Sequence, residues 1–318
     1  MTTTPIPSTT EIQLQRFDHF SPEDMEHVVN SADISHMQLG NGLFSGRAIR
    51  VLADGKVFDS GIYSQAILAR GDMPSERICF AFVLPAQTGG VIQGHPLDVA
   101  MPLLFSEGAE LNARFEPGTR WVGFQVARQE IEAYGIGFPD NQAGRVAHVS
   151  GFRKYLSKEI GSMLKDFTRL AETRIGSEDA RFAEERVEHL LSVIVHGLSP
   201  DPTEPFFPVT RGHRRLVSIA REYIDANMAD TVRIRDLCAS LGVSYTTLER
   251  AFAGVLGVTP CRYLSVARLS RTRQLLLDGN RDSIRITDIA FACGFVELGR
   301  FSRDYRLRFG ESPSQTLR

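Results

Sequence analysis

The chain has 318 residues, a length that predicts two domains at about 150 residues each. Apolar residues make up 42% of the chain and charged residues 23%, a balance that excludes a wholly disordered protein. The formal net charge of −2, taken alone, argues against nucleic acid as a partner.

The N-terminal residues 1–10 have neither a basic start nor an apolar stretch, so we expect a disordered tail there rather than a secretory signal. The longest apolar run, residues 78–86, is interrupted by Pro85 and falls far short of the roughly 20 residues that span a bilayer. The four cysteines are scattered without a C-x-x-C pair. We therefore expect a cytoplasmic protein with reduced thiols and no membrane partner.

Residues 44–126 alternate short β-rich runs with turn signals. In residues 77–84, bulky and small apolar side chains alternate, which predicts a strand buried on both faces. Several such runs predict an antiparallel β jelly-roll or barrel up to about residue 127. From about residue 151 to residue 198 the period becomes helical, and two amphipathic helices are expected either to cover the barrel or to form a homodimer through residues 152–198. Together these elements predict one domain over residues 11–198.

Residues 199–210 contain four prolines in twelve residues, which predicts an extended, semi-rigid linker between two domains. The charge changes sign at this boundary. Residues 211–318 hold 18 arginines, no lysine and 11 acidic residues, a net charge of +7, and residues 1–210 carry −9. The split predicts an acidic module joined to one that binds a polyanion.

The C-terminal region contains an internal repeat of a short helix, a glycine turn and a second helix, over about residues 234–257 and 286–310. The turn glycines are Gly242 and Gly294. One such pattern is a modest signal, because helical hairpins are common, but two copies predict a double helix-turn-helix domain over 211–318. A helix over residues 259–277 would span roughly 28 Å, close to the roughly 34 Å between adjacent major grooves on one face of DNA.

The most specific part of the repeat is Gly294-Phe295, Phe301-Ser-Arg-Asp-Tyr305 and Phe309-Gly310-Glu-Ser-Pro313. These residues resemble the second-motif signature of the AraC/XylS family of bacterial transcription regulators. Residues 220–228 and 236–238 resemble the branch that includes the ethanolamine-utilisation operon activator. The family implies a multi-domain α+β protein with a cupin-like effector-sensing domain, activation of transcription and RNA polymerase as a partner. Glu297 departs from the family, which often has serine there for helix capping.

The resemblance assigns base reading to two sets of residues, one in each recognition helix. They are Thr246, Glu249 and Arg250 in the first helix, and Leu298, Gly299, Arg300 and Arg303 in the second. Arginine can pair with guanine through two hydrogen bonds, glutamate can accept from cytosine, and the threonine methyl group can contact thymine. A further set is expected either to contact the DNA backbone or to form a solvated face. It comprises Ser244, Arg262, Arg268, Arg271, Arg306 and Arg308.

The N-terminal half is expected to sense a small effector. A pocket, if present, would be lined by strand residues, which otherwise fill the barrel core. The candidates are Arg77, Phe80, Phe82, Arg120, Trp121 and Phe124. Isolated histidines and the lack of catalytic glycine-rich or H-E-x-x-H motifs predict neither an enzyme nor a metal or other cofactor. Two alternatives stay open: a cupin-like metal enzyme with a DNA-binding tail, and a regulator that needs no effector.

Overall fold

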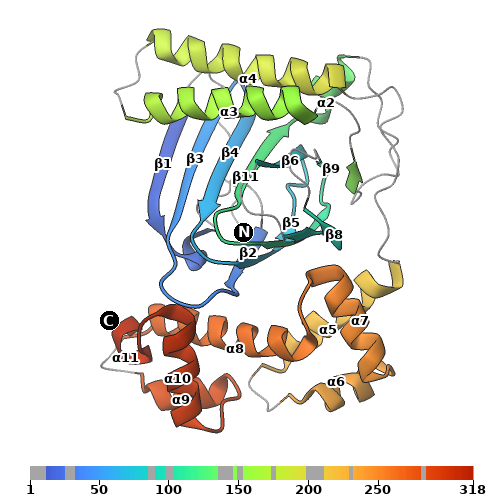
Figure 1. Ribbon diagram of the computed structural model, residues 1–318, viewed down its shortest axis with the longest axis vertical. Coiled ribbons are helices and arrows are strands. Elements are labelled where there is room, and N and C mark those ends of the chain that lie inside the picture. Colours follow the sequence, from blue (N-terminus) through green and yellow to red (C-terminus); the bar gives the residue numbers. More distant parts are fainter. Residues whose placement is uncertain are drawn as a thin grey trace.

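The molecule stacks three layers, namely a helix pair, a pair of β-sheets and a C-terminal helical domain (Figure 1). The computed structural model describes most of the chain. The described residues are 12–25, 33–84, 90–97, 103–134, 146–148, 153–172, 177–197, 211–228, 232–280 and 284–317. The tail expected over residues 1–10 and the linker expected over residues 199–210 lie outside these ranges.

Two antiparallel sheets face each other in the N-terminal half. The larger one has the strand order β1 (Gln13–Phe20), β3 (Gly46–Ala53), β4 (Lys56–Tyr63), β11 (Arg120–Val126), β6 (Ile78–Leu84), β9 (Leu103–Phe105) and β12 (Val146–His148). The smaller one has the order β2 (Asp33–Gln38), β5 (Ile67–Asp72), β10 (Glu110–Phe115), β7 (Val91–Ile92) and β8 (His95–Pro96). A short 3-10 helix, η1 (Pro22–Asp24), follows β1, and α2 (Arg128–Glu132) follows β11. The coarse prediction of antiparallel sheets followed by helices is confirmed.

The larger sheet is buried on both faces, as the alternation along β6 predicts. Phe80 and Phe124 lie in one apolar cluster with side chains of α3 (Arg153–Leu170) and α4 (Ser177–Gly197). Cys79 and Val83 lie in a second cluster, which includes side chains of the smaller sheet. The helix pair therefore covers the outer face of the larger sheet (Figure 1), which is the covering role that the helical period allowed.

The C-terminal domain is helical throughout its described residues. Its elements are α5 (Arg211–Ala226), α6 (Ile234–Leu241), α7 (Tyr245–Leu256), α8 (Pro260–Leu277), α9 (Ile286–Ala292), α10 (Leu298–Phe309) and α11 (Pro313–Thr316). Gly242 and Gly294 take positive φ angles of 64° and 77° in the turns of the two helix-turn-helix units, because both turns need a left-handed residue there. The connecting helix α8 begins after Thr259, whose side chain accepts a hydrogen bond from the backbone N–H of Arg262 at 3.3 Å.

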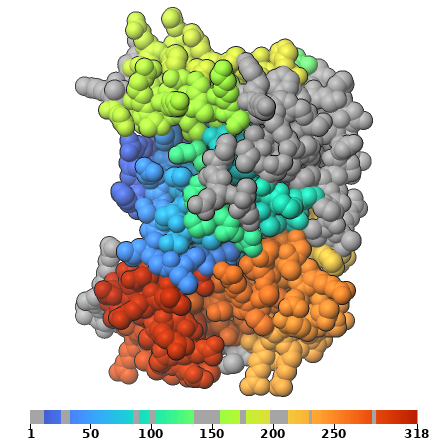
Figure 2. Space-filling model, viewed as in Figure 1, coloured from blue at the N-terminus to red at the C-terminus, as the bar shows by residue number. Residues whose placement is uncertain are grey.

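The first helix-turn-helix unit shares its core with the smaller sheet. Met37, Leu39 and Leu68 lie in the same cluster as buried side chains of α5, α7 and α8. The second unit has a separate core, which includes Phe301, Tyr305 and other side chains of α8 to α10. In the space-filling view the C-terminal residues lie directly against the strand layer (Figure 2). None of the described helices is long and apolar enough to cross a membrane.

Candidate DNA-binding surface and effector cavity

The first recognition helix, α7, presents a polar face to solvent. Ser244 caps its N-terminus and accepts a hydrogen bond from the backbone N–H of Thr247 at 3.2 Å. Apolar side chains at helical spacing, Leu248, Ala251, Phe252 and Val255, bury the opposite face. Two of the predicted base-reading residues are exposed and one is half-buried. Thr246 and Arg250 are the exposed ones. Glu249 is half-buried, and its carboxylate accepts a hydrogen bond from the Tyr245 hydroxyl at 3.1 Å.

The second recognition helix, α10, carries the more exposed cations. The side chains of Arg300 and Arg303 are 68% and 75% exposed, and each lies 3.6 Å from a carboxylate oxygen of Asp304. Gly299 is exposed, whereas Leu298 is half-buried against the core of this unit. Glu297 precedes the helix without a capping hydrogen bond from its side chain, in keeping with its poor fit to that role.

The arginines predicted to contact the DNA backbone fall into two groups. Arg271 and Arg306 are exposed. Arg262 donates to the backbone carbonyl of Leu39 at 3.3 Å, and Arg268 donates to that of Val232 at 2.9 Å. Arg308 donates to the carbonyls of Leu39 and Gly40. Burial lowers the pKa of both Arg268 and Arg308. Arg262, Arg268 and Arg308 thus donate to backbone carbonyls, whereas Arg271 donates to the side chain of Gln274.

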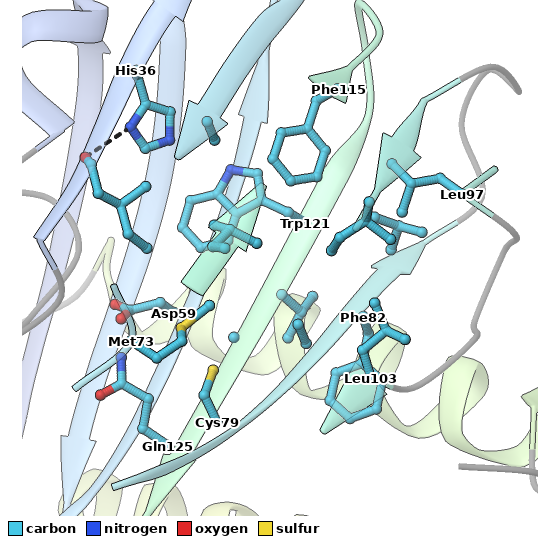
Figure 3. Close-up of a pocket in the computed structure, with 18 of the residues that line it drawn as sticks. His36, Asp59, Met73, Cys79, Phe82, Leu97, Leu103, Phe115, Trp121 and Gln125 are labelled. Atoms are coloured by element: carbon cyan, nitrogen blue, oxygen red, sulfur yellow. Dashed lines mark hydrogen bonds between the residues drawn. The ribbon is translucent and has the colours of Figure 1, made fainter. Parts of the chain in front are cut away.

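A cavity of about 80 Å³ lies between the two sheets (Figure 3). Strands of both sheets line it, because β-alternation directs every second side chain into the space that they enclose. Most of the lining is apolar, with the bulky side chains Phe82, Leu103, Phe115 and Trp121 among it. The lining residues that carry a polar side-chain atom are few and come from β2, β4 and β11. They are His36, Asp59, Tyr63, Trp121 and Gln125.

His36 and Asp59, two of the polar residues of the cavity, have partners within the protein. Nδ1 of His36 donates to the Ile34 carbonyl at 3.2 Å, because a carbonyl oxygen can only accept, and Nε2 lies 3.1 Å from the Tyr63 hydroxyl. Burial lowers the pKa of His36 to about 4, so the imidazole is neutral at neutral pH. Asp59 forms an ion pair with Arg50 at 2.8 Å. The cavity thus offers neutral polar groups and a compensated carboxylate.

The structure separates the six residues predicted to line a pocket. Phe82 and Trp121 line the cavity (Figure 3). Phe80 and Phe124 do not, because they lie on the opposite face of the larger sheet under α3 and α4. Arg77 donates to the Gly55 carbonyl at 2.5 Å, and Arg120 lies in a separate groove beside α3. Neither arginine anchors the cavity.

Apart from Trp121, the polar residues that line the cavity were not predicted from the sequence. Asp59 stands in the strand sequence Val57-Phe58-Asp59-Ser60, where an acidic residue within an apolar run is itself a signal of a special role. His36 gave no such signal, because its strand is polar and short. Among the described residues, no group of three or more His, Cys, Asp or Glu side chains is placed to hold a metal ion.

A family model described as a helix-turn-helix domain matches residues 237–318. The chain is 35% identical over 103 residues to the probable thc operon regulatory protein of Rhodococcus erythropolis, a match that covers 32% of this chain and 31% of that protein. It is 35% identical over 97 residues to the XylDLEGF operon transcriptional activator of Pseudomonas putida, covering 30% of each chain. The match thus spans less than a third of the length of these relatives.

Among solved structures, the chain is similar to a transcriptional regulator with an AraC-type DNA-binding domain from Chromobacterium violaceum. The identity is 34%, the match covers 34% of this chain and 93% of that one, and the TM-score is 0.31. The family model matches the part of the duplicated unit that runs from within α6 to the end of the chain and includes α7 to α10. Residues 237–318 of this chain therefore form a helix-turn-helix domain, and the C-terminal region is similar in sequence to these transcription regulators.

Proposed function

We propose that the chain is a transcription regulator that reads duplex DNA with α7 and α10 in two successive major grooves and responds to a small effector in the cavity between its sheets. The observation that carries the proposal is the pair of recognition helices on one rigid connector, with exposed arginines on each. Helix α8 has 18 residues and spans about 27 Å, which suits two readers for grooves roughly 34 Å apart.

The recognition helices would divide the reading between them. Arg250 and Arg303, both exposed, are assigned to guanine, and Glu249 to cytosine. Thr246 would contact a thymine methyl group. Gly299 has no side chain to read a base, and its role would be to permit close approach of the α10 backbone to the groove.

The replacement Arg303→Ala is expected to weaken binding by about 1–3 kcal/mol and to relax the preference at one base position, because it removes a two-hydrogen-bond contact to guanine. The measurement is enrichment of bound duplexes from a random library by the full chain, for the original protein and the variant. Arg181→Ala is the matched control, since Arg181 is an equally exposed arginine on α4. An unchanged base preference for Arg303→Ala would refute its assignment.

The cavity favours an effector with a few non-hydrogen atoms, largely apolar and bearing one or two uncharged polar groups. The volume of about 80 Å³ is roughly half that of an engineered cavity that admits benzene. Trp121 Nε1 is buried there and makes no hydrogen bond of normal geometry within the described residues, so a ligand acceptor can satisfy it. The resemblance to the ethanolamine branch adds small amino alcohols to the compounds to test.

Trp121 is the only tryptophan of the chain, so its fluorescence reports on the cavity. Titration of the full chain with a panel of small alcohols, amines and amino alcohols is expected to shift the emission with saturable binding for the effector class. Trp121→Phe removes the signal, and calorimetry on that variant separates binding from its optical report. No saturable change across the panel, together with no heat of binding, would remove the effector part of the proposal.

Further parts of the proposal concern architecture and partners. We infer that the facing sheets form a cupin-like jelly roll and that the protein is a regulator rather than an enzyme. We also infer that it activates transcription together with RNA polymerase, as a protein of the cytoplasm. The sequence relative from Pseudomonas putida, named as a transcriptional activator, supports the sign of regulation. A homodimer would use the outward faces of α3 and α4.

A further inference from the structure

The two recognition helices end at equivalent glycines of the internal repeat. Gly257 follows α7 and Gly310 follows α10, and their φ angles are 65° and 73°. Such left-handed glycines commonly close a helix, whose last carbonyls lack partners within the helix itself. The N-terminal sheets contact the chain at both of these points, which lie far apart in the sequence.

At the end of α7 the contact comes from β10. Arg114 donates from Nη1 to the carbonyl oxygen of Gly257 at 2.6 Å. The approach is close, because a Cβ atom on Gly257 would lie 2.9 Å from the same Nη1. Arg114 also pairs with Glu116 at 3.1 Å, so its guanidinium group is fixed from the sheet side as well.

At the end of α10 the contact comes from β2 and the loop after it. The backbone N–H of Gly42 donates to the carbonyls of Leu307 and Arg308, at 3.0 and 3.1 Å. The side-chain amide of Gln38 donates to the Arg308 carbonyl at 2.7 Å and to that of Gly42 at 2.7 Å. Gln38 is only 2% exposed. The N-terminal domain therefore supplies donors to the unpaired carbonyls at the end of the second recognition helix.

These contacts leave the base-reading ends of both helices uncovered. Arg250 lies in the first half of α7 and Arg303 in the first half of α10, and both are exposed in the same structure in which the helix ends are held. The smaller sheet thus holds α7 through β10 and α10 through β2 while the predicted DNA surface stays open. Strand β2 also lines the cavity with Ile34 and His36, just before Gln38.

We infer that Gln38 and Arg114 are positioning residues for DNA binding, which fix the two recognition helices relative to each other through the smaller sheet. The inference rests on the proposed function. Restricting the motion of two linked readers before they bind raises the affinity for a site that needs both and leaves the affinity of each reader alone unchanged. Strand β2 lines the cavity and also carries Gln38, which contacts the end of α10. An effector in the cavity would therefore contact the strand that positions α10.

The test uses the full chain and two duplexes selected by it, one with both half-elements and one with a single half-element. Gln38→Met keeps the shape of the side chain and removes its donors. We expect about tenfold weaker binding to the two-element duplex, since a lost buried hydrogen bond shifts an equilibrium by about that factor, and unchanged binding to the half-element. Gln15→Met, at an exposed position of β1, is the matched control and should change neither affinity.

Two further measurements keep the outcome decisive. Hydrogen exchange of the full chain should be faster in residues 39–45 and 306–310 of Gln38→Met than of Gln15→Met. Arg114→Met independently removes the hydrogen bond to the end of α7 and should also weaken binding to the two-element duplex alone. If Gln38→Met fails to fold, this variant still tests the inference. Equal or stronger two-element binding by the folded variants overturns the inference. Failure of the unaltered chain to bind either duplex specifically instead overturns the proposed function.

Discussion

Raising the salt concentration from about 50 to about 200 mM is expected to lower the affinity of the full chain for its selected duplex by about 10³-fold. A protein that neutralises about six phosphates releases the counterions condensed on them, and salt opposes that release. Residues 211–318 carry a net charge of +7, and all of their basic side chains apart from histidine are arginines, which is enough positive charge to neutralise about six phosphates. Fluorescence anisotropy of a labelled duplex over a series of salt concentrations measures the slope.

The slope also reports which arginines take part. Arg306→Ala removes an exposed cation of α10 and is expected to reduce the slope by about one phosphate. Arg181→Ala, on the far helix pair, should leave the slope as it is. Arg262 and Arg308 donate to carbonyls of the β2–β3 loop, so their substitution tests whether they leave those acceptors for DNA. A slope near zero for the original chain would contradict DNA binding through the arginine-rich domain.

The replacement Phe124→Ala is expected to lower the free energy of unfolding of the N-terminal domain by about 3–5 kcal/mol. Phe124 is fully buried between the larger sheet and the helix pair, so its loss removes apolar contact and leaves a void that neighbouring strands cannot close. Urea unfolding followed by the fluorescence of Trp121 measures the effect in the domain concerned, because no other tryptophan is present.

A matched substitution separates volume from position. Phe124→Leu should cost only about 1 kcal/mol, because it keeps most of the apolar volume. Since Phe124 lies on the face of the sheet away from the cavity, a folded Phe124→Leu protein should bind cavity ligands as the original does. A loss below about 1 kcal/mol for the alanine variant would show that this core relaxes into the space, contrary to its complete burial.

The C-terminal domain was largely predictable because its signals are local. The spacing of Leu248 and Phe252, the turn glycine Gly242 and the capping Thr259 each act within a few residues of the element that they define. The repeat then supports each assignment twice. Helix boundaries follow from such nearest-neighbour chemistry, and the structure places α8 where the helical pattern from Thr259 onward predicts it.

The cavity was less predictable, because its lining depends on which face of a sheet meets which neighbour. Alternation along β6 and β11 separates Phe80 and Phe124 from Cys79 and Gly123 but does not say which set faces the helices. That choice is made by α3 and α4, whose apolar stripes come much later in the chain. The sequence therefore predicts Phe80 and Phe124 in a pocket, although both pack beneath the helix pair.

The state of the surface arginines could not be predicted either. Arg262 and Arg271 stand nine residues apart on α8 in similar sequence surroundings. Both are exposed, but Arg262 donates to the Leu39 carbonyl across the domain boundary, whereas Arg271 donates to Gln274 of its own helix. The difference arises from the docking of the β2–β3 loop, a contact between segments more than 200 residues apart that no local pattern encodes.

The close approach at Gly310 limits how freely the two halves of the chain can be recombined. A Cβ atom on Gly310 would come within 2.8 Å of the backbone nitrogen of Leu43, so the loop and the helix end fit only each other's backbone. A chimera that joins residues 211–318 to an unrelated sensor domain would keep both recognition helices. It would lose the contacts that the smaller sheet and its loop make with the ends of these helices. If the proposed function holds, an exchanged sensor has to bring β2, its loop and β10 together with the cavity, because the same strands line the cavity and contact the helix ends.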